Sequence, residues 1–160
     1  MESFNHFGVY GICQRDGRLL VIHKGKGPYS GRYDLPGGRL EAGEALVDGL
    51  IREFIEETGY TVKVQQNLGT YDFFIRHNED HYTQMHHLAA LYQVELTGEE
   101  EPVAISMFEE QDSRGAEWVD ITRITLESAS PFAVYAARFL RGEELPVTPE
   151  YHDDWEVKGT

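Results

Sequence analysis

Most of the side chains that could do chemistry in this sequence lie between residues 38 and 59. They are acids, one arginine and two glycines at fixed intervals: Gly38, Glu44, Arg52, Glu53, Glu56, Glu57 and Gly59. Residues three and four apart share one face of a helix, so Glu53, Glu56 and Glu57 are expected to lie together. Their like charges repel each other, and Arg52 is the single base between residues 41 and 62. Because Mg²⁺ and Mn²⁺ prefer carboxylate oxygens, the cluster predicts a site for a hard divalent cation.

A helix over residues 44–58 is expected to carry these acids, ending at Gly59. Its apolar residues recur at helical spacing and predict one buried stripe: Val47, Leu50, Ile51 and Phe54. The three carboxylates are expected on roughly the opposite side of the helix. Arg52 precedes Glu56 by one turn and can brace its carboxylate. Glu44, near the helix start, suits the positive end of the helix dipole.

The string G-x5-E-x7-R-E-F-I-E-E-T-G resembles the Nudix box, the signature of hydrolases that act on a nucleoside diphosphate linked to another moiety. The run before it, GRYDLPGGRLEAGE, is also similar to the family's approach to the box. The resemblance implies that Mg²⁺ or Mn²⁺ is held by the carboxylates of Glu53, Glu56 and Glu57 and by the backbone carbonyl of Gly37. It further implies that Arg52 orients the glutamates, so the expected catalytic residues are Arg52, Glu53 and Glu56.

The resemblance leaves the general base open. Glu53 serves in some members of the family, whereas others use a glutamate from a later loop. Glu109, Glu110 and Glu117 are the candidates for such a late base or ligand, and each is also expected as an ordinary solvated acid.

Substrate-binding residues are expected around the Gly-rich segment at residues 25–38. Lys24 precedes this segment and could meet a phosphate, Tyr33 could stack on a base, and Gly38 opens the box. The alternatives are an exposed lysine at a strand end and a tyrosine in the core.

The identity of the substrate rests on subfamily markers that this sequence lacks. ADP-ribose hydrolases are associated with a proline about fifteen residues after the box, and this sequence has Phe74 at that position. The absence of these markers favours a nucleoside triphosphate as substrate, which would be cleaved to the monophosphate and pyrophosphate. An oxidised nucleoside triphosphate is one form of this hypothesis. An ADP-ribose or nucleotide-sugar pyrophosphatase is the alternative among enzymes, and a ligand-sensing domain without catalysis is the alternative from another class. The intact set of mutually repelling glutamates disfavours the sensor.

Strand patterns surround the expected helix. Residues 6–14 and 18–24 are predicted as a hairpin that turns at Asp16 and Gly17. Further strands are predicted at 61–66, 70–76, 84–96 and 116–121, and a second helix at 131–140. This order predicts an α/β (α+β) fold, a Nudix-like α/β/α sandwich with a mixed β-sheet between helices.

Length and charge set the remaining expectations. The 160 residues predict a single domain over 1–160 with an acidic tail from about residue 142, and this tail and the acidic run at 95–113 are interpreted as solvated loops. A formal net charge of −14 argues against nucleic acid and anionic membrane as partners. It allows a small-molecule nucleotide substrate bridged by a divalent cation.

The compartment follows from what the sequence lacks. A single cysteine, Cys13, excludes an internal disulfide and is interpreted as a small core residue. The first residues do not form a secretory signal, and no apolar run is long enough to span a bilayer. We therefore expect a cytoplasmic protein, as a monomer or a homodimer.

Overall fold

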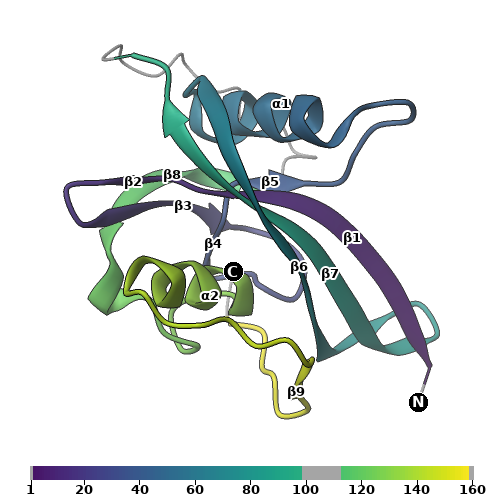
Figure 1. The fold of residues 1–160 in the computed structure, drawn as a ribbon. Coiled ribbons are helices and arrows are strands. Elements are labelled where there is room, and N and C mark those ends of the chain that lie inside the picture. Colours follow the sequence, from purple (N-terminus) through teal and green to yellow (C-terminus); the bar gives the residue numbers. More distant parts are fainter. Residues whose placement is uncertain (1, 99–112, 159–160) are drawn as a thin grey trace.

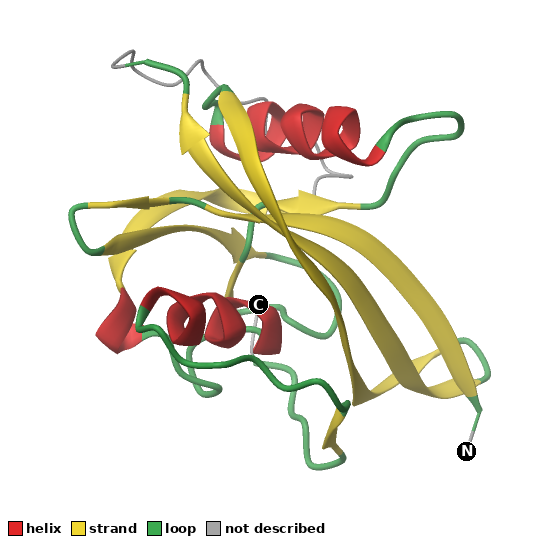
Figure 2. Ribbon diagram, viewed as in Figure 1, coloured by secondary structure: helices red, strands yellow, loops and turns green. Residues whose placement is uncertain are grey.

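The computed structural model describes residues 2–98 and 113–158, which form two sheets and two α-helices (Figure 1). The elements in chain order are β1 (Ser3–Ile12), β2 (Gln14–Arg15), β3 (Arg18–Lys24), β4 (Tyr33–Asp34), β5 (Gly37–Gly38), α1 (Leu46–Thr58), β6 (Val62–Glu79), β7 (Tyr82–Leu96), β8 (Ser113–Asp120), the 3₁₀ helix η1 (Ile121–Arg123), α2 (Pro131–Leu140) and β9 (Glu150–His152). The two helices lie on opposite sides of the strands (Figure 2). The predicted mixed α+β fold with helices on both faces is confirmed.

The strands form two sheets where the sequence predicted one. The five-stranded sheet has the order β5-β1-β7-β6-β9 and is mixed, because β1 runs parallel to β7 and β7 antiparallel to β6. In the other sheet, β3 pairs with β2, β4 and β8, all antiparallel. The chain passes from β1 through Cys13 into β2, so one stretch of sequence contributes to both sheets. The predicted hairpin turn is confirmed, since Asp16 and Gly17 both have positive φ angles.

Two apolar cores lie on the two faces of these sheets. On the α1 side, Leu50 and Phe54 pack with Cys13 and residues of β1, β3, β6 and β7. Gly11 lets this helix approach closely, because a Cβ at residue 11 would lie 2.5 Å from the Phe54 ring. On the α2 side, a larger core includes Phe73 and Phe132. Cys13 is buried as expected, and burial raises the pKa of its thiol to about 12.

The start of α1 and the side that it buries both differ from the prediction. The helix begins at Leu46 after Ala45 as N-cap, so Glu44 lies before it. Val47 is 39 % exposed, whereas Glu57 is only 8 % exposed. The placement of all three carboxylates opposite the apolar stripe was therefore wrong for Glu57. Residue 57 follows Leu50 by seven positions, almost two full turns, and so shares its buried side.

The segments predicted at 61–66 and 70–76 form one strand. β6 runs through residues 62–79 with register shifts near Gln66 and Gly69, and it pairs with β7 to form a long ribbon (Figure 1). The second helix has the predicted bounds, and the Ser130 side chain caps it by accepting a hydrogen bond from the backbone of Ala133.

The acidic tail is not wholly solvated, contrary to expectation. β9 adds to the five-stranded sheet beside β6, and Glu150 accepts a hydrogen bond from the Tyr135 hydroxyl at 2.8 Å. The guanidinium of Arg32 lies 3.9 Å over the Trp155 ring. Among the described residues, no helix is long and apolar enough to cross a membrane.

Candidate active site

The candidate site is built where the short strand β5 meets β1. Gly37 pairs with Tyr10 and Gly38 with Val9 in antiparallel register. Gly37 has a φ of +147°, and a Cβ at this position would lie 2.1 Å from the carbonyl oxygen of Val9. Only glycine fits this close approach of two backbones. The approach leaves the Gly37 N–H free to donate to Oε1 of Glu57 at 2.8 Å.

Glu57 is a buried carboxylate that faces the sheet from α1. Burial raises the pKa of Glu57 well above its usual range, and the nearby charge of Glu53 raises it further. The hydrogen bond from Gly37 and the positive charge of Lys24 act in the opposite direction. Burial dominates, so the ionised carboxylate costs folding free energy unless a cation offsets it.

Glu53 lies one turn before Glu57, against β5. A Cβ at Gly38 would lie 3.0 Å from Oε1 of Glu53, so the glycine makes room for this carboxylate. The Glu53 side chain is 15 % exposed, and burial raises its pKa to about 7 despite the attraction of Arg52. A carboxyl group with this pKa takes up and releases a proton near neutral pH.

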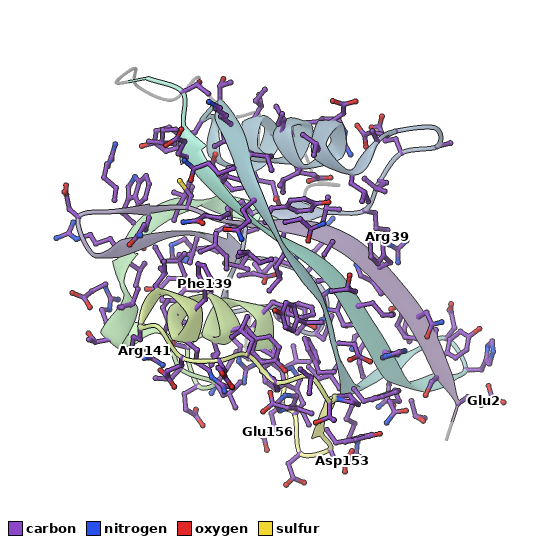
Figure 3. The ribbon with its side chains drawn as sticks, in the orientation of Figure 1. Glu2, Arg39, Phe139, Arg141, Asp153 and Glu156 are labelled. Atoms are coloured by element: carbon purple, nitrogen blue, oxygen red, sulfur yellow. The ribbon has the colours of Figure 1, made fainter. Side chains whose placement is uncertain are left out.

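Arg52 connects the remaining acids of the box. Its Nε and Nη2 donate to the two oxygens of Glu44 at 2.7 and 2.9 Å, a two-pronged contact that helps lower the Glu44 pKa to about 2. Its Nη1 donates to Glu53 at 3.1 Å and to Glu56 at 3.2 Å. Its Nη2 also reaches the carbonyl of Arg39, which lies beside β1 in Figure 3. The geometry matches the orienting role expected for Arg52.

The carboxylate ligands of the box suit a hard cation, although in this structure they form hydrogen bonds within the protein. Among residues 2–98 and 113–158, no group of three or more His, Cys, Asp or Glu side chains could already hold a metal ion. Glu53 and Glu56 are bonded to Arg52, and Glu57 to Gly37. Burial raises the pKa values of Glu53 and Glu57, and the positive charges of Arg52 and Lys24 offset this only in part. A divalent cation would add to that positive charge.

The structure places the other predicted site residues as follows. Lys24, at the end of β3, lies close enough for its charge to lower the pKa values of Glu53 and Glu57. Tyr33 is half-buried, with its ring 5.1 Å from that of His23, and its hydroxyl accepts a hydrogen bond from Arg123 at 3.0 Å. Tyr33 therefore packs in part against the core on the α2 side, which was the alternative to stacking on a base.

Of the three late glutamates, only Glu117 lies among the described residues, and its partner there is outside the box. Glu117 on β8 contacts Nε2 of His23 at 2.9 Å. It pairs with Val21, whose side chain belongs to the core on the α2 side, whereas the box glutamates are on α1. Glu109 and Glu110 lie outside the described residues.

Two buried polar residues near the site were missed by the sequence analysis. Asp34, in the run before the box, accepts hydrogen bonds from the backbone of Leu35 at 2.8 Å and from the hydroxyl of Ser130 at 2.5 Å. This contact ties the start of α2 to the approach to β5. His87 is 2 % exposed and lies between two tyrosine hydroxyls. The Asp in YDLPGG was visible in the sequence, but no local pattern indicated the partners of either residue.

The comparisons with known proteins agree with this geometry. The NUDIX domain model matches residues 3–141, so the chain belongs to the NUDIX family. An ADP-ribose pyrophosphatase of Methanocaldococcus jannaschii is 29 % identical over 72 % of this chain and 62 % of its own length. A putative 8-oxo-dGTP diphosphatase of Bacillus subtilis is 30 % identical over 72 % of this chain and 66 % of its own. The chain thus matches slightly less than two thirds of the length of these relatives.

Solved structures share the fold. A MutT NUDIX hydrolase from Burkholderia pseudomallei superimposes with a TM-score of 0.64 at 23 % identity, covering 84 % of this chain and 97 % of that one. An ADP-ribose pyrophosphatase from Streptococcus suis gives a TM-score of 0.58 at 14 % identity, covering 91 % and 98 %. At these identities the likeness concerns the fold alone.

Proposed function

We propose that this protein is a Mg²⁺- or Mn²⁺-dependent hydrolase that cleaves a phosphoanhydride bond in a nucleoside diphosphate-linked substrate. The observation that carries the proposal is a pair of carboxylates held against β5, the buried Glu57 and the partly buried Glu53, both with raised pKa values. A domain that only bound a ligand would gain nothing from keeping these charges uncompensated.

Each residue of the box has a part in the proposed reaction. Glu53, Glu56 and Glu57, with the Gly37 carbonyl, would hold the cation, which would neutralise charge on the phosphates and acidify the attacking water. Arg52 keeps Glu53 and Glu56 oriented while Glu44 holds Arg52 in place. Glu53 is our candidate for the base among the described residues, because it is the less exposed of the two box carboxylates that Arg52 orients, and the bound cation would favour its ionised form.

Two substrates compete within this proposal. A nucleoside triphosphate, in one version oxidised, is the first candidate, and the relative named putative 8-oxo-dGTP diphosphatase supports it. ADP-ribose is the second, supported by the relative named ADP-ribose pyrophosphatase. We propose the triphosphate as the primary substrate, because Phe74 stands where the proline associated with ADP-ribose hydrolases is expected.

Product analysis tests the reaction and separates the two substrates. The protein is incubated with nucleoside triphosphates, 8-oxo-dGTP or ADP-ribose in excess Mg²⁺, and products are separated by chromatography. Monophosphate with pyrophosphate identifies the first substrate class, and AMP with ribose 5-phosphate the second. The same products are measured with Glu57→Gln, which should lose hydrolysis. Asp48→Asn changes an exposed acid on the same helix and is the matched control. Full hydrolysis in EDTA would refute the cation, and binding without any product would favour the sensor.

Other expectations from the sequence stay predictions. They are the single-domain organisation, the cytoplasmic location, and a monomeric or homodimeric state without nucleic acid or membrane partners.

A further inference from the structure

A buried histidine lies outside the box, in the middle of the five-stranded sheet. Nε2 of His87 is 3.0 Å from the Tyr10 hydroxyl, and Nδ1 is 2.6 Å from the Tyr29 hydroxyl. Burial keeps the pKa of His87 well below its usual range, so its ring is neutral. A neutral imidazole has one N–H donor and one acceptor nitrogen, and the two hydroxyls satisfy both. Removing either hydroxyl leaves a buried polar atom without its partner.

Tyr10 connects this histidine to the box. Its ring lies beside two glycines: a Cβ at Gly37 would be 2.8 Å from Cδ1 of Tyr10, and a Cβ at Gly8 would be 2.8 Å from its hydroxyl oxygen. Tyr10 is also the backbone partner of Gly37. Because the Gly37 N–H holds Glu57, the Tyr10 ring contacts the residue that fixes this carboxylate.

The other end of the arrangement reaches the C-terminal segment. The ring of Trp155 packs edge-on against Tyr29, with centroids 6.0 Å apart, and its Nε1 donates to the carbonyl of Pro28 at 2.8 Å. The guanidinium of Arg32 lies over the ring of the same tryptophan. Trp155 lies beyond residue 141, where the match to the NUDIX domain ends. A segment outside the matched domain therefore packs on the loop that carries Tyr29.

We propose that His87 is a positioning residue for the Gly37–Glu57 contact, acting through Tyr10, and that Trp155 braces the same arrangement through Tyr29. The chain of contacts runs from the C-terminal segment through the sheet to the box. Its effect on turnover rests on the proposed function, but its effect on the geometry of Gly37 does not. The competing hypothesis is that these rings only fill the core.

Amide hydrogen exchange at Gly37 tests the proposal in metal-free protein. Tyr10→Phe keeps the ring and removes the hydroxyl, and the Gly37 amide is followed by NMR with ¹⁵N-glycine labelling. Exchange at Gly37 should quicken at least about 10-fold, because a buried hydrogen bond has been broken beside it. The amide of Ala136, a buried residue inside α2, serves as the reference for unfolding away from the box, and the Gly37 rate is compared with it.

Tyr71→Phe is the matched control. It removes a half-buried hydroxyl that donates to the carbonyl of Leu68 at 2.8 Å, and it should leave the exchange at Gly37 unchanged relative to Ala136. Tyr29→Phe removes the other partner of His87 and should quicken exchange at Gly37 in the same direction, by less. This milder variant carries the test if Tyr10→Phe does not fold.

The outcomes separate the two hypotheses. A lower melting temperature with an unchanged ratio of Gly37 to Ala136 exchange in both variants would mean that the rings only fill the core. If the enzyme turns over substrate, Tyr10→Phe should also need several-fold more Mg²⁺ for half-maximal rate. If no substrate is turned over, the proposed function fails and the exchange result still decides the positioning role.

Discussion

Replacing Glu53 with glutamine should stabilise the metal-free protein, and more so at high pH. Folding raises the pKa of Glu53 from an ordinary 4.5 to about 7, so the folded state holds this proton more tightly than the unfolded state. The free energy of unfolding therefore falls as the pH rises from 4.5 to about 7 and is level above that range. Glu53→Gln removes the ionisation while keeping an oxygen that can accept from Arg52.

The size of the effect follows from the same pKa. Titration of Glu53 lowers the free energy of unfolding by about 3 kcal/mol at pH 8.5 and by about 1 kcal/mol at pH 5.5, where the group is ionised in the unfolded state but still protonated in the folded one. The variant should thus gain about 2 kcal/mol more at the higher pH. For a chain of this length, that corresponds to about 4–8 °C in melting temperature.

Thermal melts of the wild type and Glu53→Gln in EDTA, at pH 5.5 and 8.5, measure this difference. Comparing the two proteins at each pH cancels the titration of groups that Glu53 does not influence. Glu57 is an exception: losing the Glu53 charge lowers its pKa, which also favours the variant at the higher pH. Asp48→Asn, an exposed change in the first turn of α1, should lose a few tenths of a kcal/mol equally at both pH values. An equal gain for Glu53→Gln at both pH values, or no gain, would contradict the desolvated carboxylate.

Three further substitutions test neighbouring parts of the site. Glu57→Gln can still accept from Gly37, so in EDTA the variant should melt no lower than wild type, while turnover falls at least about 10²-fold. Arg52→Lys loses the two-pronged contact with Glu44 and should slow turnover about 10- to 100-fold, measured at saturating Mg²⁺. Gly37→Ala places a Cβ against the carbonyl of Val9 and should cost at least about 2 kcal/mol in chemical denaturation.

The box was predictable because its chemistry is local. Arg52, Glu53 and Glu56 are four residues apart or fewer, so helix geometry alone brings them together. The bounds of α2 were equally local, set by Pro131 at its first turn and by a run of apolar residues that only Arg138 interrupts. The hairpin at Asp16 followed from turn chemistry in the same way.

Contacts across the sheets were not predictable from one sequence. His87 meets Tyr10 and Tyr29 only because β7 lies next to β1 and the loop before β4 folds over them. The C-terminal segment appeared solvated because its charge is visible in the sequence, whereas the packing of Trp155 on Arg32 joins residues 123 positions apart. The prediction for Glu57 was wrong for a different reason. Its charge indicated an exposed side chain, whereas its position seven residues after Leu50 indicates the buried side of the helix.

The charges of the box explain why Arg52 alone cannot satisfy it. Four glutamates, at 44, 53, 56 and 57, and the exposed Glu41, 3.7 Å from Nε of Arg52, share the positive charges of Arg52 and Lys24, which leaves an excess of three negative charges when all are ionised. Arg52 contacts the glutamates at 44, 53 and 56, but its strongest contact is with Glu44. A divalent cation would offset most of this excess, and the carboxylates of Glu53, Glu56 and Glu57 have lone pairs left to hold it while Arg52 keeps its hydrogen bonds. Glu44 would then keep the guanidinium in place, which gives this residue a reason to lie outside the helix, beside Arg52 and not among the metal ligands.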